Sequence, residues 1–168
     1  MRFKNTTETR IVPSVYMIII AAFITNIFVN FELMSPDNES TIKFSHFLPN
    51  ILLLLFGIYF HKIAQLFEFD SDGETLNFKN NGIFFSKFME YRVKRAEFPK
   101  GKLVKFEVND FLIYTSLKIW IRSRRKKGPR KYTFNITFLG KKKKKGMIAS
   151  LKKVLETNQA NTANTVSR

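Results

Sequence analysis

The part of the chain that decides its fold is residues 67–82, which read FEFDSDGETLNFKNNG. Large apolar residues alternate with polar ones on both sides of Asp72-Gly73, and Asn81-Gly82 closes the stretch. A period of two predicts strands that are buried on one face, and an Asp-Gly or Asn-Gly pair between such strands is the strongest short-range signal for a hairpin. We therefore expect antiparallel β-structure here.

The same alternation returns towards the C-terminus, over residues 104–109, 117–122 and 132–138. A further strand is expected from Ile83 towards Tyr91. After five consecutive lysines the apolar residues follow helical spacing, at Met147, Ile148, Leu151, Val154 and Leu155. This pattern predicts an amphipathic helix that caps the open end of the sheet. The polar residues 157–168 are expected to form a disordered tail.

Two uncharged apolar stretches precede the strands. Residues 11–31 are long enough, at about 1.5 Å per residue, to cross a hydrocarbon core of roughly 30 Å. The second uncharged stretch, residues 44–60, is short for a span, but a span over about 44–62 is sufficient if Lys62 reaches the interface. The alternative for the first stretch is a signal peptide, but no small-x-small cleavage site precedes Glu32. The alternative for the second is a core helix, although its apolar residues cover all helix faces.

The orientation of these spans follows from the basic residues at their ends. Arg2, Lys4 and Arg10 precede the first span, whereas the loop 32–43 carries only Lys43 beside three acidic residues. We therefore expect both termini to be cytoplasmic and the loop to lie outside.

Asn26 and Asn30 lie one helical turn apart in the first span. We expect them to make hydrogen bonds to the second helix. The alternative is a polar pathway or a docking point for another membrane protein.

Together these patterns predict a membrane protein of the α+β class. Its expected parts are a cytoplasmic N-terminal segment 1–10, a two-helix transmembrane hairpin 11–62, a cytoplasmic antiparallel β-domain with a capping helix 63–156, and the tail 157–168.

This order of two spans, six or seven short strands and one helix resembles the bacterial membrane proteins that carry a pleckstrin-homology-like (PH-like) domain. The resemblance implies a β-barrel or sandwich, a multi-pass protein of the bacterial cytoplasmic (inner) membrane, and a small interaction or scaffold module without known chemistry. The chain departs from phosphoinositide-binding domains at the first hairpin loop, because residues 70–74 hold three acids and no base. Specific binding of inositol phosphates at that loop is therefore not expected.

Lys and Arg total 29 against 13 Asp and Glu, a formal net charge of +16. One basic cluster surrounds Gly128-Pro129 in an expected hairpin loop and comprises Arg122, Arg124, Arg125, Lys126, Lys127, Arg130 and Lys131. The other precedes the C-terminal helix and comprises Lys141, Lys142, Lys143, Lys144 and Lys145. Five cations at a helix N-terminus oppose the macrodipole, so a bound anion would relieve them.

Three interpretations fit these clusters: a solvated basic surface, contact with anionic lipid headgroups, or binding of nucleic acid or the ribosome. The last is the weakest because Trp120 and the phenylalanines are expected to be needed for the core. We therefore expect a membrane-anchored interaction module, an accessory subunit or scaffold that binds a membrane-protein partner and whose basic surface contacts anionic lipid. A nucleic-acid- or ribosome-associated membrane protein is the alternative.

No catalytic site is expected. The chain has no Cys, and no G-x-S-x-G, P-loop or H-E-x-x-H motif occurs. His46 and His61 flank the second span, about 22 Å apart along a helix, which is too far to share a metal. A hairpin turn accounts for the acidic residues Asp70, Asp72 and Glu74 without a metal. We expect no enzyme activity, no cofactor and no metal ligands.

Overall fold

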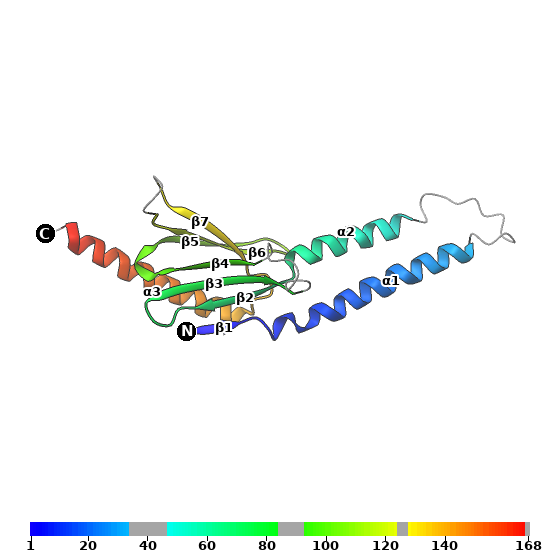
Figure 1. Cartoon of the computed structure of the whole chain (residues 1–168), viewed down its shortest axis with the longest axis horizontal. Coiled ribbons are helices and arrows are strands. Elements are labelled where there is room, and N and C mark those ends of the chain that lie inside the picture. Colours follow the sequence, from blue (N-terminus) through cyan, green and yellow to red (C-terminus); the bar gives the residue numbers. More distant parts are fainter. Residues whose placement is uncertain (34–46, 84–92, 124–127, 167–168) are drawn as a thin grey trace. The chain divides into compact units, whose positions relative to one another are not determined.

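The computed structural model describes residues 1–33, 47–83, 93–123 and 128–166 (Figure 1). The chain forms two compact units. One, which we call the β-unit, contains residues 1–9 and 64–168; the other, which we call the helical unit, contains residues 10–63. The first nine residues therefore belong to the β-unit, although the helical unit separates them from the rest of it in the chain.

The helical unit contains two antiparallel helices, α1 (Val12–Leu33) and α2 (Leu48–Ile63). A hydrogen bond of 2.9 Å joins the Tyr16 hydroxyl, near the start of α1, to Nδ1 of His61, near the end of α2. The Tyr16 ring also meets the Phe60 ring edge-on, with centroids 5.4 Å apart. The two helices thus pack against each other through aromatic side chains at this end.

Within the described part of the chain, only α1 has the length and composition of a membrane span. The candidate span runs over the 23 residues Glu8–Asn30; its most apolar part has a mean hydropathy of 2.1, and 6% of that part is buried. Helix α2 has 16 residues, just below the roughly 17–25 residues of an ordinary span. The second span expected over 44–62 is therefore observed as a shorter apolar helix. Its residues 44–46 and the loop residues 34–43 lie outside the described residues.

The β-unit contains a four-stranded antiparallel sheet in the order β1-β2-β3-β4. Its strands are β1 (Arg2–Lys4), β2 (Gln65–Asp70), β3 (Thr75–Gly82) and β4 (Lys94–Pro99). The predicted turn at Asp72-Gly73 joins β2 to β3, and Gly73 adopts the left-handed φ of 63° that glycine tolerates. Strand β1 was not expected, since three residues are too few to show a period. The strand expected from Ile83 to Tyr91 falls almost entirely on residues 84–92, outside the described residues.

A second antiparallel sheet has the order β5-β6-β7. Its strands are β5 (Leu103–Asp110), β6 (Thr115–Ile121) and β7 (Arg130–Asn135). They fall on the three stretches of alternating residues. Strand β7 ends before the expected Phe138, because the Thr137 N–H donates to the Asn135 side chain at 3.0 Å and the chain turns there.

One buried cluster joins both sheets to the C-terminal helix α3 (Lys141–Val166), which crosses the sheets in Figure 1. The Phe78 ring stacks on Phe98 and Phe134, with centroids 5.9 and 5.4 Å apart. Met147 and Leu151 of α3 are fully buried in the same cluster. The β-unit is thus an α+β arrangement in which the helix caps the core, as its apolar spacing predicts.

Helix α3 continues to Val166, so the expectation of a disordered tail over 157–168 is corrected for residues 157–166. Asn158 contributes to this extension. Its Nδ2 donates to the carbonyl oxygens of Lys100 and Leu103, at 2.9 and 3.0 Å. This contact with the chain between β4 and β5 lies beyond Leu155, the last residue of α3 that packs against the core.

Candidate functional site

Two of the five lysines at the start of α3 are held by the β-unit itself. Lys143 Nζ lies 2.9 Å from Glu8 Oε2 and donates to the Lys4 carbonyl oxygen at 2.8 Å. The side chains of Lys143 and Glu8 are 30% and 27% exposed. Lys143 therefore ties the first turn of α3 to the residues that follow β1.

Lys144 makes a second such tie, to the last residue of β5. Its Nζ lies 2.6 Å from Asp110 Oδ2, and the Thr115 hydroxyl donates to Asp110 Oδ1 at 2.8 Å. The bond from Lys144 and then the bond from Thr115 hold the pKa of Asp110 below its ordinary value of 3.8. Lys144 therefore fixes the base of the β5–β6 hairpin.

Glu8 and Asp110 supply negative charge where the helix macrodipole favours it. The anion site predicted at Lys141–Lys145 is thus partly filled by carboxylates of the chain. Lys141, Lys142 and Lys145 are exposed, and no ion pair in the described part of the chain includes them. These three are the cations of this cluster that remain available to a ligand.

The other basic cluster lies where β6 ends and β7 begins, at the end of these strands that is away from the first cluster. Arg122 follows β6, and Arg130 and Lys131 begin β7. The Arg130 guanidinium lies 4.9 Å from the Tyr132 ring centroid. The remaining members of the predicted cluster, Arg124, Arg125, Lys126 and Lys127, lie outside the described residues.

Strand β6 separates the two basic clusters. At one end Thr115 pairs with Asp110, beside Lys144; at the other end Ile121 pairs with Arg130. Seven residues of strand span about 20 Å at roughly 3.3 Å per residue. The structure therefore does not bring the two clusters together, and a small ligand cannot bridge them.

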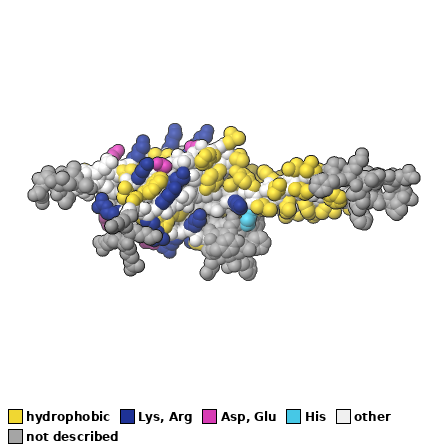
Figure 2. All heavy atoms as spheres, turned by 90° about the horizontal axis from the view of Figure 1, so that it is seen from above, with side chains coloured by type: hydrophobic (Ala, Val, Ile, Leu, Met, Phe, Trp, Pro, Cys, Tyr) yellow, Lys and Arg dark blue, Asp and Glu magenta, His cyan; other side chains and the backbone are white. Residues whose placement is uncertain are grey.

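Trp120 lies outside the buried core, on the face of β6 opposite the buried Ile119. It stands in register with Lys105 and Lys131, whose Nζ atoms lie 5.3 and 5.5 Å from its ring centroid. The expectation that Trp120 is needed for the core is therefore wrong. Figure 2 shows how Lys and Arg side chains spread over one face of the β-unit.

A feature that was not expected from the sequence lies at the hairpin that Lys144 braces. The residues between β5 and β6 read FLIY, from Phe111 to Tyr114, and Leu112 is fully exposed. A signal was present, because hairpin turns ordinarily carry Asn, Gly or Asp rather than four apolar residues. The two-residue period drew attention to the strands on each side and not to the turn between them.

In the helical unit, the two predicted contact residues bond to each other. Asn30 Nδ2 donates to Asn26 Oδ1 at 2.9 Å, along α1. Asn30 and Asn50 line the same groove between α1 and α2. Asn50 Oδ1 is buried and accepts no hydrogen bond from the described residues. A hydrogen bond between the two helices is observed from Tyr16 to His61.

The acidic hairpin loop behaves as a turn. Asp70 Oδ1 accepts a hydrogen bond from the Asp72 N–H at 2.9 Å, which is an ordinary turn contact. Among the residues that the structure describes, no three His, Asp or Glu side chains are grouped closely enough to hold a metal ion. His46 lies outside those residues.

Comparisons with known proteins found no matching family model, no similar curated protein and no similar solved structure.

Proposed function

We propose that this chain is a small, non-catalytic interaction or scaffold module, anchored in the bacterial cytoplasmic membrane as an accessory subunit of a membrane-protein assembly. The helical unit is its anchor, and the PH-like β-unit is its binding part. The observation that carries this proposal is the pairing of β1 with β2 across the helical unit.

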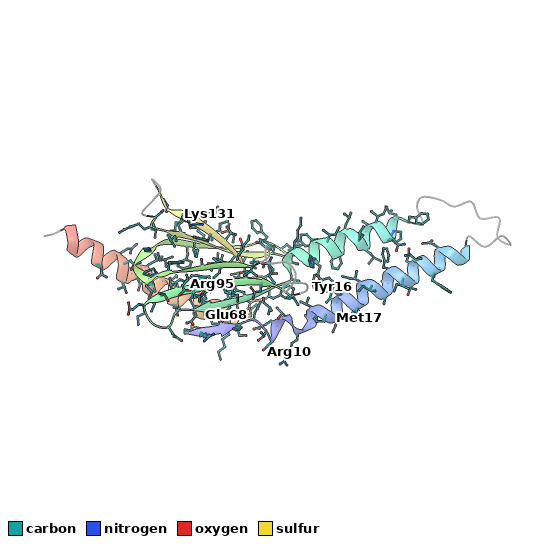
Figure 3. The ribbon with its side chains drawn as sticks, in the orientation of Figure 1. Arg10, Tyr16, Met17, Glu68, Arg95 and Lys131 are labelled. Atoms are coloured by element: carbon teal, nitrogen blue, oxygen red, sulfur yellow. The ribbon has the colours of Figure 1, made fainter. Side chains whose placement is uncertain are left out.

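That pairing is made by backbone and side chains together. The register joins Arg2 to Asp70, Phe3 to Phe69 and Lys4 to Glu68. Glu68 on β2 (Figure 3) also forms ion pairs of 3.3 and 3.2 Å with Arg2 and Lys4. Phe67 extends the contact, because its carbonyl oxygen accepts from the Asn5 N–H at 3.2 Å and its own N–H donates to Asn5 Oδ1 at 2.8 Å.

Strands of one sheet must lie on the same side of a membrane. Residues 10–63 leave one strand and return to its neighbour, so they cross a membrane twice or not at all. The apolar and exposed surface of α1 favours two crossings. A single crossing, or cleavage of α1 as a signal peptide, would take β1 out of the sheet.

The charges at the helix ends favour cytoplasmic termini. Arg2, Lys4 and Arg10 precede α1, and only Lys43 lies in the loop 32–43. A sheet of four strands, a sheet of three strands and a capping helix support the PH-like assignment. One strand precedes the helices, however, whereas the resemblance places all strands after them.

The basic surface adds a contact with anionic lipid to this role. A Lys near an anionic membrane surface contributes about 1 kcal/mol. Lys141, Lys142 and Lys145 are exposed and therefore suited to it, while Lys143 and Lys144 hold the fold together.

Reporter fusions test the anchor. A reporter that is active only outside the cytoplasm should be silent after Arg168 and active when inserted beside Asn38. Activity in the opposite pattern, or silence at both sites, would contradict the proposal. Gentle detergent extraction of a tagged chain, followed by identification of the proteins that remain bound, tests the accessory role; recovery of the chain alone would count against it.

The second candidate function, association with nucleic acid, gains support from Trp120. An aromatic ring on a sheet surface, next to Lys105 and Lys131, is a suitable platform for stacking a base. The test is absorbance at 260 nm of the detergent-purified chain after a high-salt wash. Nucleic acid that persists in the parent and is lost in Trp120→Ala would favour this alternative over the protein-binding role.

A further inference from the structure

The hairpin between β5 and β6 ends in an apolar apex, which we define as Phe111, Leu112 and Ile113. The Phe111 N–H donates to the Tyr114 carbonyl oxygen at 2.8 Å, so Leu112 and Ile113 form a two-residue loop. Leu112 is fully exposed, and Phe111 and Ile113 are 62% and 60% exposed. No other large apolar side chain in the described β-unit is exposed to this extent.

These residues conflict with the usual chemistry of a hairpin turn in water. Two-residue loops favour Asn-Gly, Asp-Gly or Gly-containing pairs, whose side chains are small or polar. Adjacent exposed apolar side chains instead mark a surface that binds something apolar. Leu112 and Ile113 therefore fit an apolar environment better than they fit water.

The base of the hairpin is braced, so the apex has a fixed support. Asp110 binds both Lys144 and the Thr115 hydroxyl, as described above. The Thr115 N–H donates to Thr137 Oγ1 at 3.1 Å, so the start of β6 is also bonded to a residue that follows β7. The rings of Phe111 and Tyr114 stack with centroids 6.5 Å apart.

The apex lies at the end of the β-unit where the chain leaves for the helical unit. Lys144 binds Asp110 at the base of the hairpin, and its neighbour Lys143 binds Glu8. Glu8 is one residue before the end of the segment 1–9, so the hairpin and the end of that segment lie close together. The returning chain lies at the same end. Asn80 Nδ2 donates both to the side chain of Gln65, at the start of β2, and to the carbonyl oxygen of Asn135. Asn135 pairs with Ser116 near the start of β6, so Gln65 lies at the end of the β-unit where the hairpin has its base.

We propose that the apex inserts into the interfacial region of the bilayer, while Lys141, Lys142 and Lys145 contact anionic headgroups around it. The bond from Lys144 to Asp110 puts the start of α3, which carries these lysines, at the same end of the β-unit as the apex. An apolar group and cations at one end match the two layers of a membrane surface, acyl chains below and phosphates above. This inference rests on the proposed membrane anchor and adds a second point of attachment to it. It also assigns the bilayer-facing end of the β-unit.

A second copy of the chain is a less suitable occupant. A stable protein interface buries about 800 Å² on each partner, which is more than three side chains can supply. A bilayer sets no such minimum, because the anchor already keeps the apex near it.

The absence of native Cys in the sequence makes the test direct. Leu112→Cys, labelled with the environment-sensitive dye NBD, is compared with Gly101→Cys in the full chain. Gly101 is a matched control, since a side chain there meets nothing within 4 Å. Arg122 and Asn158 bond to its neighbours Lys102 and Lys100, which places it at the far end of the β-unit.

Both variants are placed singly in nanodiscs of phosphatidylcholine with phosphatidylglycerol. We expect the dye at residue 112 to emit at shorter wavelength, to be quenched by lipid-attached nitroxides and to be shielded from iodide. Equal iodide quenching at residues 112 and 101 would overturn the insertion while leaving the anchor intact. Failure of the chain to enter discs would overturn the anchor and the insertion together.

A second variant separates insertion from folding. Leu112→Asn with Ile113→Gly supplies the preferred two-residue loop, so the hairpin should remain folded. With the dye moved to Phe111→Cys, this change should abolish the blue shift seen with Phe111→Cys alone. An unchanged shift would show that the apolar side chains do not carry the contact and would overturn the proposal.

Discussion

The ring of Phe3 lies 5.3 Å from the ring of Phe69, although the whole helical unit separates these residues in the chain. Phe3 is the one apolar side chain of β1, and it packs against the edge of the buried core. Residues 1–9 are therefore structural members of the β-unit. An isolated β-unit must include them.

The first prediction concerns that isolation. Residues 1–9, joined through a short Gly/Ser linker to residues 64–168, should unfold cooperatively in urea. Phe3→Ala in this joined β-unit should lower the free energy of unfolding by about 2 kcal/mol, less than the ~3–5 kcal/mol of a fully buried Phe because this ring is half-buried. Circular dichroism gives the midpoints. Equal midpoints for the joined β-unit and for residues 64–168 alone would contradict a structural role for β1.

The second prediction concerns the capping helix. Leu151→Asp places a charge at a fully buried position, and should cost about 4 kcal/mol or more of the free energy of unfolding. Lys152→Asp is the matched control, because Lys152 is the next residue of the helix and its side chain is exposed. A Leu151→Asp variant that melts like the control would show that α3 does not close the core.

The third prediction is a pH dependence at Asp110. The bond from Lys144, followed by the bond from Thr115, lowers the pKa of Asp110 from 3.8. A lowered pKa in the folded state means that ionised Asp110 stabilises the fold at higher pH, and that this contribution is lost as pH falls through the lowered pKa. NMR titration of the carboxyl carbon in the joined β-unit should give a midpoint below 3.8. Lys144→Gln should raise the midpoint, and Lys145→Gln should leave it unchanged; equal midpoints in both variants would contradict the assigned contact.

The fourth prediction divides the lysine cluster by role. Replacing Lys141, Lys142 and Lys145 together by Gln should weaken binding of the joined β-unit to anionic vesicles about 100-fold, from about 1 kcal/mol for each cation. The melting temperature should not fall. Replacing Lys143 and Lys144 should instead lower the melting temperature, because their carboxylate partners lose them. Vesicle sedimentation measures the binding. Equal binding by the triple variant and the parent would contradict a lipid contact and show that the three lysines are only a solvated surface.

Much of the β-unit could be predicted from local patterns. Alternation located β2, β3, β5, β6 and β7, and helical spacing identified Met147 and Leu151 as buried. Strand β4 was missed although its pattern is present, because Ala96 and Phe98 are buried between exposed neighbours. Strand β1 carries no such pattern. It forms because residues 2–4 pair with the edge of β2, more than sixty positions away in the chain. A pattern within a few neighbouring residues cannot predict such a distant pairing.

The candidate site was harder to predict for the same reason. Five adjacent lysines look equivalent in sequence, yet Glu8 and Asp110 divide them into two that hold the fold and three that face solvent. Those partners are 135 and 34 residues away from the lysines they bind. The apex was recognisable in principle, since Leu112 and Ile113 occupy turn positions where polar residues are usual.

The central claim is that residues 4 and 68, which are partners in the β1–β2 register, lie together on the cytoplasmic side of a membrane that residues 10–63 cross twice. Single variants Lys4→Cys, Asn38→Cys and Glu68→Cys allow a direct measurement with a membrane-impermeant maleimide, because the chain has no native Cys. In intact cells we predict labelling of residue 38 alone, with residues 4 and 68 labelled only after the membrane is opened. Labelling of residue 4 without residue 68, or of residue 68 without residue 4, would contradict the shared sheet, and protection of all three in intact cells would contradict the double crossing.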